Sequence, residues 1–181
     1  MHVIVALNGA YPHPERTLSL LLGAERIVAA DGGANWLAQQ GRMPDVLVGD
    51  MDSVAPALLA RLEAAGCRVA RHRRDKDETD GELALREALA LGARRITLLG
   101  AWGGRSDHAL ANLGLLALPE LAEVQVVVFD GLSWLWLLRG EGEVQGEAGD
   151  MVSLLPWGGD ALGVWTAGLA YPLRDEPLRM G

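Results

Sequence analysis

Cysteine and lysine each occur once in this chain of 181 residues, and both shortages exclude classes of protein. With Cys67 as the sole thiol, no disulfide can form within the chain, and a cytoplasmic protein is the simplest interpretation. The sole lysine, Lys76, lies between two aspartates, whereas a P-loop needs a lysine between glycine and serine or threonine. The chain therefore has no P-loop.

Long apolar runs, metal-ligand spacings and an excess of positive charge are also missing. No apolar run reaches the roughly 20 residues of a transmembrane helix, and the N-terminus lacks the basic and apolar regions of a signal peptide. The four histidines and the cysteine do not have the spacing of a zinc site. The net charge of −8 argues against the phosphate backbone of a nucleic acid. We therefore expect no membrane partner and no nucleic-acid partner.

The first 130 residues alternate between strand-like and helix-like patterns. The expected strands are 2–7, 26–30, 46–49, 67–71, 95–99 and 124–129, and the expected helices are 15–22, 34–40, 55–65, 80–91 and 107–117. Strands separated by helices form βαβ units, so we predict an α/β domain with a mainly parallel open sheet flanked by helices. Thr79 and Ser106 precede helical patterns and are expected to cap them.

After Asp130 the helical patterns stop. Short β-like runs at 133–139, 151–155 and 162–166 alternate with turns that are rich in glycine or contain proline. We predict a small antiparallel β-sandwich over 131–181, with tryptophans in its core. Such a small module buries little surface alone, and its apolar runs predict a homodimer contact.

Polar, glycine-containing turns follow successive strands of the first domain. These turns are "ADGGAN" (30–35), "GDMDS" (49–53), "RHRRDKDETDGE" (71–82) and "GAWGGRSDH" (100–108). Because the carboxyl ends of parallel strands lie along one edge, we expect the charged residues of these turns to share a cleft. They are Asp31, Asp50, Asp52, Asp75, Lys76, Asp77, Asp80, Arg105 and Asp107.

So many acidic groups in one cleft need cations. Mg²⁺ prefers carboxylate oxygens together with substrate phosphates. Gly103 and Gly104 precede a helix, where backbone N–H groups can approach a phosphate. Arg105 beside them can donate two hydrogen bonds from its guanidinium group to the phosphate oxygens. Each motif alone also fits a solvated turn or a helix cap, so the prediction depends on their joint occurrence.

The ordered motifs "ADGGANWL", "PDVLVGDMDSV", "DKDETDGELAL" and "GAWGGRSDHALANLGLL" resemble the thiamine pyrophosphokinase (thiamine diphosphokinase) family. The resemblance covers residues 1–130 and continues more loosely into "GDMVSLLP" and "GLAYPLRDEPLRMG". It implies an enzyme that transfers a pyrophosphoryl group from ATP to the hydroxyl of thiamine, with Mg²⁺ as cofactor and AMP as second product. It also implies an ATP-binding catalytic domain at 1–130, a thiamine-binding and dimerisation domain at 131–181, and a cytoplasmic homodimer.

The resemblance assigns roles residue by residue. The catalytic set is Asp50, Asp52, Asp80 and Asp107, and the first three of these are the metal ligands. The nucleotide-binding set is Asp31, Gly32, Gly33, Asn35, Lys76, Thr79, Gly103, Gly104, Arg105 and His108. In the family, the position of Lys76 can reach the active site of the partner subunit.

The expected reaction is in-line attack by an alcohol on the β-phosphorus of Mg-ATP, with Asp80 or Asp107 orienting or deprotonating the hydroxyl. Family members continue into a Ser-Asn-Glu segment that contacts thiamine, whereas this sequence stops at Gly181. Either the sequence is truncated or its substrate contacts differ. Two alternatives therefore stay open: a pyrophosphokinase for another alcohol such as a pterin, and an inactive sensor of nucleotide or thiamine diphosphate.

Overall fold

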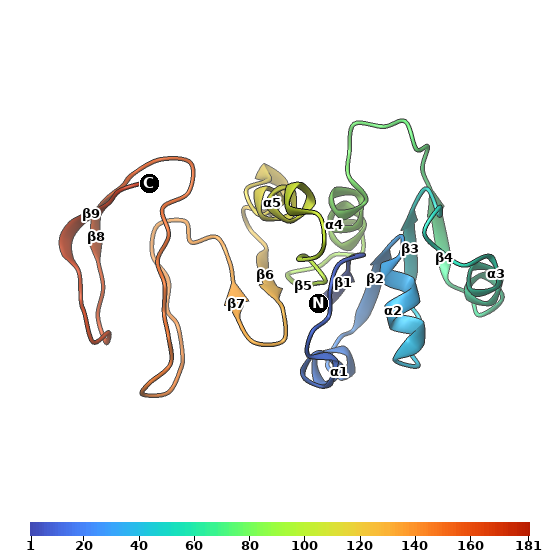
Figure 1. The fold of residues 1–181 in the computed structure, drawn as a ribbon, viewed down its shortest axis with the longest axis horizontal. Coiled ribbons are helices and arrows are strands. Elements are labelled where there is room, and N and C mark those ends of the chain that lie inside the picture. Colours follow the sequence, from blue (N-terminus) through green and yellow to red (C-terminus); the bar gives the residue numbers. More distant parts are fainter. The chain divides into compact units, whose positions relative to one another are not determined.

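A computed structural model describes all 181 residues, which form two compact units. Unit 1 comprises Met1–Arg139 and unit 2 comprises Gly140–Gly181, whereas the sequence predicted a boundary at residue 131. Unit 1 contains the helices and the larger sheet, and unit 2 contains two paired strands (Figure 1). None of the helices has the length and apolar character that a membrane span requires.

Unit 1 is built on a seven-stranded sheet with the order β4-β3-β2-β1-β5-β6-β7. The strands are β1 (His2–Ala6), β2 (Arg26–Ala30), β3 (Val46–Gly49), β4 (Arg68–Arg71), β5 (Arg95–Leu99), β6 (Gln125–Phe129) and β7 (Trp134–Leu135). All pairs up to β6 are parallel, and β7 pairs antiparallel with β6. The predicted α/β class with a mainly parallel sheet is therefore confirmed.

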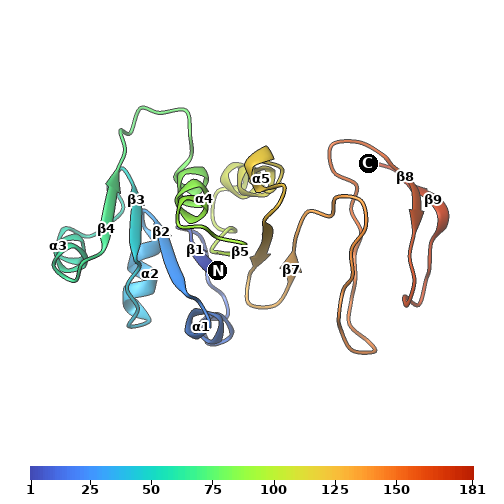
Figure 2. The same cartoon turned by 180° about the vertical axis from the view of Figure 1, so that it is seen from behind.

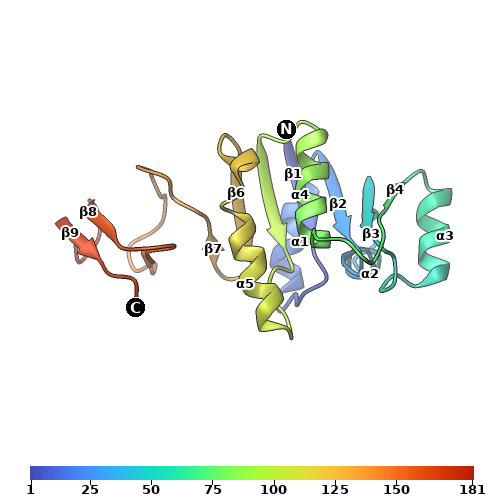
Figure 3. The same ribbon diagram turned by 90° about the horizontal axis from the view of Figure 1, so that it is seen from above.

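Helices cover both faces of this sheet (Figure 3). They are α1 (Pro14–Leu22), α2 (Gly33–Gln39), α3 (Pro56–Ala64), α4 (Asp80–Ala90), α5 (Ser106–Leu115) and the short 3₁₀ helix η1 (Pro119–Leu121). Side chains alternate along β1, so Val3 and Val5 pack with α4 and α5, while Ile4 and Ala6 pack with α1, α2 and α3. Two buried apolar layers therefore hold the strand ends in fixed positions.

Local sequence sets where several helices begin. Pro14 and Pro56 occupy the first helical positions of α1 and α3, where a missing N–H costs nothing. Thr79 caps α4, since its hydroxyl accepts a hydrogen bond of 3.1 Å from the Glu82 N–H, as predicted. The expectation that Ser106 caps the next helix is wrong, because α5 begins at Ser106 itself and its capping position is Arg105.

The order of the strands creates a crevice in the middle of the sheet. The chain builds β2, β3 and β4 on one side of β1 and then crosses through α4 to place β5 on the other side. The loops after β1 and β5 therefore leave in opposite directions at their carboxyl ends. Open α/β sheets bind ligands at this kind of switch point.

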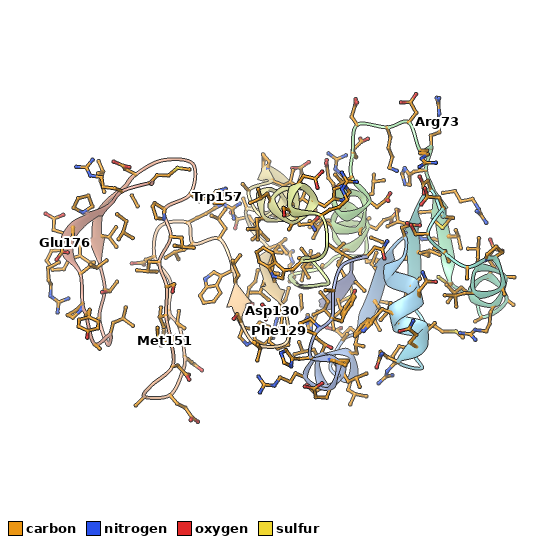
Figure 4. All side chains as sticks on the ribbon, in the orientation of Figure 1. Arg73, Phe129, Asp130, Met151, Trp157 and Glu176 are labelled. Atoms are coloured by element: carbon orange, nitrogen blue, oxygen red, sulfur yellow. The ribbon has the colours of Figure 1, made fainter.

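The edge strand β7 belongs to the first unit, not to the second domain as predicted. The run 133–139 was expected in the second domain, but Trp134 and Leu135 extend the sheet of unit 1. The Asp130 carboxylate accepts hydrogen bonds from the N–H groups of Leu132 and Ser133, which turns the chain back. The rings of Phe129 and Trp134 then stack with centroids 4.2 Å apart. Phe129 and Asp130 are labelled at this turn in Figure 4.

Unit 2 contains one antiparallel pair, β8 (Ala161–Trp165) with β9 (Arg174–Leu178). The predicted strand at 162–166 is confirmed, whereas 151–155 forms no strand because it has no pairing partner. Its tryptophans were expected in a core, but Trp157 and Trp165 are 52% and 65% exposed. Unit 2 therefore has strand pairing without a buried core of its own.

Candidate active site

A cleft of about 640 Å³ opens at the carboxyl edge of the unit 1 sheet. Its lining comes from the ends or following loops of β1, β2, β3 and β5, from the β4–α4 loop, from the first turn of α4 and from the first two turns of α5. All of these segments belong to unit 1. The cleft therefore lies at the switch point between β1 and β5, where the topology places a binding site.

Three carboxylates form the most concentrated charge in this cleft. Asp31, Asp50 and Asp52 each place one carboxylate oxygen within 4.8 Å of the others. Asp31 is buried, and its Oδ1 has no hydrogen-bond partner. Burial raises the pKa of Asp31, and the neighbouring Asp80 carboxylate raises it further. An unpartnered buried oxygen among hard oxygen donors fits a divalent cation such as Mg²⁺.

The backbone at this cluster is unusual. Asp31 and Met51 have φ values of 44° and 68°, in the left-handed region that residues other than glycine seldom occupy. Such conformations cost on the order of 1–3 kcal/mol each and are found most often at functional sites. Asp31 directly follows β2 and Met51 lies two residues after β3, and both direct the chain so that Asp31, Asp50 and Asp52 meet.

Gly49, the last residue of β3, lets two carboxylates from different elements come close. A Cβ added at this glycine would lie 3.1 Å from the Asp31 Cβ and 3.3 Å from the Asp80 Oδ1. Its φ of 143° is also one that residues with a side chain rarely adopt. Asp80, the first residue of α4, therefore adds a fourth carboxylate to the edge of the cluster.

The nearest positive charges come from the loop between β4 and α4. The Lys76 Nζ lies 3.0 Å from the Asp80 Oδ1, although the angles of this ion pair do not make a hydrogen bond. Arg74 lies 3.5 Å from Asp52, with a side chain that is 84% exposed. Lys76 therefore lies in the same cleft as the acids of its own chain, as expected from the strand ends, and its reach into a partner subunit stays a prediction.

The N-terminus of α5 forms the opposite wall of the cleft, with Gly103, Gly104 and His108 in the lining. Arg105 donates to Asp107 through Nε at 3.1 Å and Nη2 at 2.5 Å. This pairing lowers the pKa of Asp107 to about 2. Arg105 is nevertheless 67% exposed, so its guanidinium is open to a phosphate that enters the cleft.

The structure brings most predicted site residues into one lining. They are Asp31, Asp50, Asp52, Lys76, Thr79, Asp80, Gly103, Gly104, Arg105 and His108. Gly32 and Gly33 instead lie at the start of α2, and the Asn35 side chain donates a hydrogen bond of 2.7 Å to the Ser53 carbonyl. These three residues therefore support the loops of the site and are not in its lining.

The remaining predicted acids lie outside the lining. Asp107 is held beside it by Arg105. Asp75 and Asp77 were expected in the cleft but are exposed and absent from its lining, and Asp75 pairs with Arg73 at 4.0 Å. The loop is long enough for its charged side chains to alternate between the cleft and the solvent.

Several residues of the lining were not in the predicted set. The most polar are Asn8, Ser53, Arg74, Glu78 and Asn112, and Trp102 adds an aromatic surface. Asn8 could have been predicted from the sequence, because Asn8 and Gly9 form a polar, glycine-containing turn after β1, like the turns that follow the other strands. Asn112 carried none, because a residue in the interior of a helix is placed only by tertiary packing.

One known protein family matches most of unit 1. The family model "Thiamin pyrophosphokinase, catalytic domain" matches residues 17–128. The chain belongs to the thiamin pyrophosphokinase family. The resemblance expected from the four motifs is thereby confirmed.

Individual members of the family extend the similarity beyond the matched region. Thiamine pyrophosphokinase of Bacillus subtilis is 28% identical over 156 residues, covering 85% of this chain and 73% of the relative. Thiamine pyrophosphokinase 1 of Oryza sativa subsp. japonica is 28% identical and covers 99% of this chain and 76% of the relative. The similarity therefore includes unit 2 as well as the matched residues of unit 1.

Solved structures of the family agree with this fold. The crystal structure of the Bacillus subtilis thiamine pyrophosphokinase has a TM-score of 0.84 at 25% identity, covering 100% of this chain and 86% of that one. The structure from Geobacillus thermodenitrificans has a TM-score of 0.81 at 27% identity, covering 99% and 83%. The family match contains every carboxylate of the cleft, so the acidic site lies within the family's catalytic domain.

Proposed function

We propose that this protein is a thiamine diphosphokinase, which transfers a pyrophosphoryl group from ATP to the hydroxyl of thiamine. The observation that supports it most is the acidic cluster with the unpartnered Asp31 Oδ1, facing Arg105 across the cleft of a family catalytic domain. Carboxylates on one side of the cleft and Arg105 on the other suit a substrate in which a cation is bound to phosphate groups.

The carboxylates of the cluster are the proposed holders of the metal. Asp31, Asp50 and Asp52 supply oxygens within 4.8 Å of one another, and Asp80 stands beside them across Gly49. Mg²⁺ bound here would neutralise phosphate oxygens and polarise the phosphorus under attack. The cluster itself keeps these oxygens in place before any ligand arrives, because both strand ends are fixed by the core.

The opposite wall is the proposed phosphate site. Arg105 can move one of its N–H donors from Asp107 to a phosphate oxygen, and Gly104, where an added Cβ would meet nothing within 4 Å, leaves the N-terminus of α5 open to the phosphate. Gly103 lets this loop pass close to Gly9, since an added Cβ would lie 3.1 Å from the Gly9 Cα. We assign Lys76, Thr79 and His108 to the same ligand. The proposed nucleotide pocket includes Asp31, which lies in the cleft lining. Gly32, Gly33 and Asn35 contribute to it by supporting the loops that form the cleft.

The transfer forms a bond between the thiamine hydroxyl oxygen and the β-phosphorus of ATP. The bond from that phosphorus to the α,β-bridging oxygen breaks, AMP leaves with this oxygen, and the hydroxyl proton passes to a base. Asp107 is a poor base while Arg105 holds its pKa near 2. We therefore assign to Asp80 the orientation or deprotonation of the hydroxyl, the role that the sequence left open between the two.

For the second unit we propose thiamine binding and dimerisation in a cytoplasmic homodimer. Large apolar side chains of unit 2 are open to solvent, among them Met151 at 92% and Leu155 at 79% exposure. Met151 and Trp157 are labelled on this unit in Figure 4. Exposed apolar area of this kind usually marks an interface. A second copy of the chain, packed about a two-fold axis, would cover it.

Light scattering tests the dimer. We expect a mass of twice 19.3 kDa at micromolar concentration for the wild type and a monomer for Leu155→Glu. Glu141→Gln, which changes one charge at an exposed position of the same unit, is the control and should stay dimeric. A monomeric wild type would contradict the proposed assembly.

The activity is tested by separating the products of ATP, Mg²⁺ and an alcohol. With thiamine we expect AMP and thiamine diphosphate in equal amounts. AMP formation with a pterin alcohol but not with thiamine would assign another acceptor. Nucleotide binding without any AMP would identify an inactive sensor, and ADP formation would contradict pyrophosphoryl transfer altogether.

A further inference from the structure

The positive charge beside the acidic cluster comes from one segment, the loop between Arg71 of β4 and Asp80 of α4. In Figures 1 and 2 this loop arches out beyond the end of the sheet before it returns to α4. It brings Lys76 to Asp80 and Arg74 to Asp52. The cluster and its counter-ions are therefore parts of the same chain.

The two cations of the loop differ in how firmly they are held. The Arg74 side chain is 84% exposed and lies 3.5 Å from its partner, which makes a weak surface ion pair. The Lys76 side chain is only 14% exposed, and its Nζ lies 3.0 Å from the Asp80 Oδ1. An ammonium group loses much of its hydration at such a site, so the nearby carboxylate charge must compensate it.

The atom that Lys76 approaches is also exceptional. Asp80 Oδ1 and Asp31 Oδ1 are buried side-chain atoms without a hydrogen-bond partner, and both carboxylates lie against Gly49. The Lys76 ammonium thus stands beside the group of oxygens that fits a divalent cation. Two cations this close repel each other strongly in a partly buried site.

We propose that Lys76 is a tethered counter-ion, whose ammonium group competes with the divalent cation for the Asp80 carboxylate within its own subunit. Metal loading releases the ammonium, which then pairs with the phosphates of the nucleotide. The loop carries it between the two positions. This inference rests on the proposed function for the identity of the ligands, but the competition itself requires only the metal.

The sole lysine makes this movement directly observable. Reductive methylation with ¹³C-formaldehyde labels Lys76 and the N-terminal amine and keeps their positive charges, and Lys76→Arg identifies the lysine signal by its loss. We expect a lysine signal distinct from that of exposed dimethyl-lysine in the metal-free protein. Mg²⁺ alone should move it toward the exposed value, and Mg-ATP should move it to a third position.

Asp80→Asn removes the partner of Lys76 and serves as the reference for the free ammonium group. In this variant the signal should start at the exposed position without metal. A wild-type signal that coincides with that of Asp80→Asn in the absence of metal would overturn the proposal. So would a wild-type signal that Mg²⁺ does not move.

Calorimetric Mg²⁺ binding, without nucleotide, provides a second readout. Lys76→Gln should bind Mg²⁺ about tenfold more tightly than wild type, because a competing charge at contact distance is gone. Arg73→Gln is the matched control, since it removes one positive charge from the same loop at a side chain that is 85% exposed and outside the cleft lining. Its affinity should change less than about twofold, because solvent screens an exposed charge.

Lys76→Arg retains the charge and should bind Mg²⁺ nearly as the wild type does. Equal effects of Lys76→Gln and Arg73→Gln would show a general charge effect and overturn the competition. Failure of the proposed function has a different signature: the lysine signal responds to Mg²⁺, yet ATP and thiamine give no AMP. Normal AMP formation with an unresponsive lysine signal would contradict only the tethered counter-ion.

Discussion

Unit 1 and unit 2 differ sharply in how far their apolar side chains are buried. Every buried hydrophobic residue of the protein lies between Val3 and Phe129, in unit 1. Unit 2 has no buried residue, although it carries Met151, Trp157 and Trp165. Unit 1 can therefore hold an active site by its own packing, whereas unit 2 must pack against another surface to bury a core.

The same comparison applies to charge. Unit 1 is rigid enough to hold four carboxylates close together, one of them a buried aspartate with an unpartnered oxygen. In unit 2 the Asp160 carboxylate accepts hydrogen bonds from the Met180 N–H and from Arg179, and these bonds lower its pKa. A carboxylate that is hydrogen-bonded within its own chain stabilises the fold, whereas a buried carboxylate oxygen without a hydrogen-bond partner indicates a ligand site.

The largest effect should come from the acidic cluster. Asp50→Asn and Asp52→Asn should each lower turnover by two to three orders of magnitude, roughly what loss of one charge-stabilising group costs in other enzymes. Asp75→Asn is the matched control, because it removes the same charge from an exposed position outside the cleft. Steady-state kinetics at saturating Mg²⁺ measure this. An equal loss in the control would place the effect outside the cluster.

Core truncations compare the two units directly. Leu47→Ala empties a fully buried position of β3 and should cost about 2–5 kcal/mol. Leu155→Ala, at a side chain that is 79% exposed in unit 2, should leave unit 1 intact. Hydrogen exchange of the unit 1 strands measures both effects. Comparable loss of protection in the two variants would show that unit 1 depends on unit 2.

Arg105→Lys keeps the charge of the proposed phosphate site but loses the two parallel N–H donors of the guanidinium group. We expect turnover or ATP affinity to fall by about tenfold, the worth of one hydrogen bond between charged groups. Arg73→Lys makes the same substitution at an exposed position outside the lining and should behave as wild type. Unchanged kinetics in Arg105→Lys would remove Arg105 from the phosphate site.

The smallest effect should appear in the stability of the metal-free protein. Because the pKa of Asp31 is raised by burial, its ionised form destabilises the fold as the pH rises above the ordinary carboxyl range. Asp31→Asn should therefore raise the melting temperature at pH 7 with a chelator present, and the gain should vanish below about pH 4. Thermal unfolding at both pH values measures it. A lower melting temperature at pH 7 would contradict the assignment of an unsatisfied acid.

Much of unit 1 could be predicted from the sequence because its signals are local. Apolar runs of strand length, helical spacing and the Thr79 cap gave the strands and helices up to Phe129 with small errors at their ends, apart from the short helix η1, which was not predicted. The shared edge of a parallel sheet then brought Asp31, Asp50, Asp52 and Asp80 together. That inference needed only the direction of the strands.

The remaining features of the fold and the site could not be predicted from the sequence, because they depend on contacts between distant segments. The run at 133–139 has strand character, but only the Phe129–Trp134 stack and the Asp130 turn decide which sheet it joins. The left-handed backbone of Asp31, which completes the acidic cluster, has no signature in composition. Likewise, nothing in "RRDKDE" shows that Lys76 turns to the cleft and Asp75 to the solvent.

Phosphorus NMR of the purified chain with ATP, thiamine and Mg²⁺ tests the central claim most directly. The account predicts that the three ATP resonances are replaced by that of AMP and the two of thiamine diphosphate, and that Asp50→Asn abolishes this change. Accumulation of ADP, or of thiamine monophosphate, would show attack at the γ-phosphorus and contradict pyrophosphoryl transfer. An unchanged ATP spectrum would contradict catalysis itself.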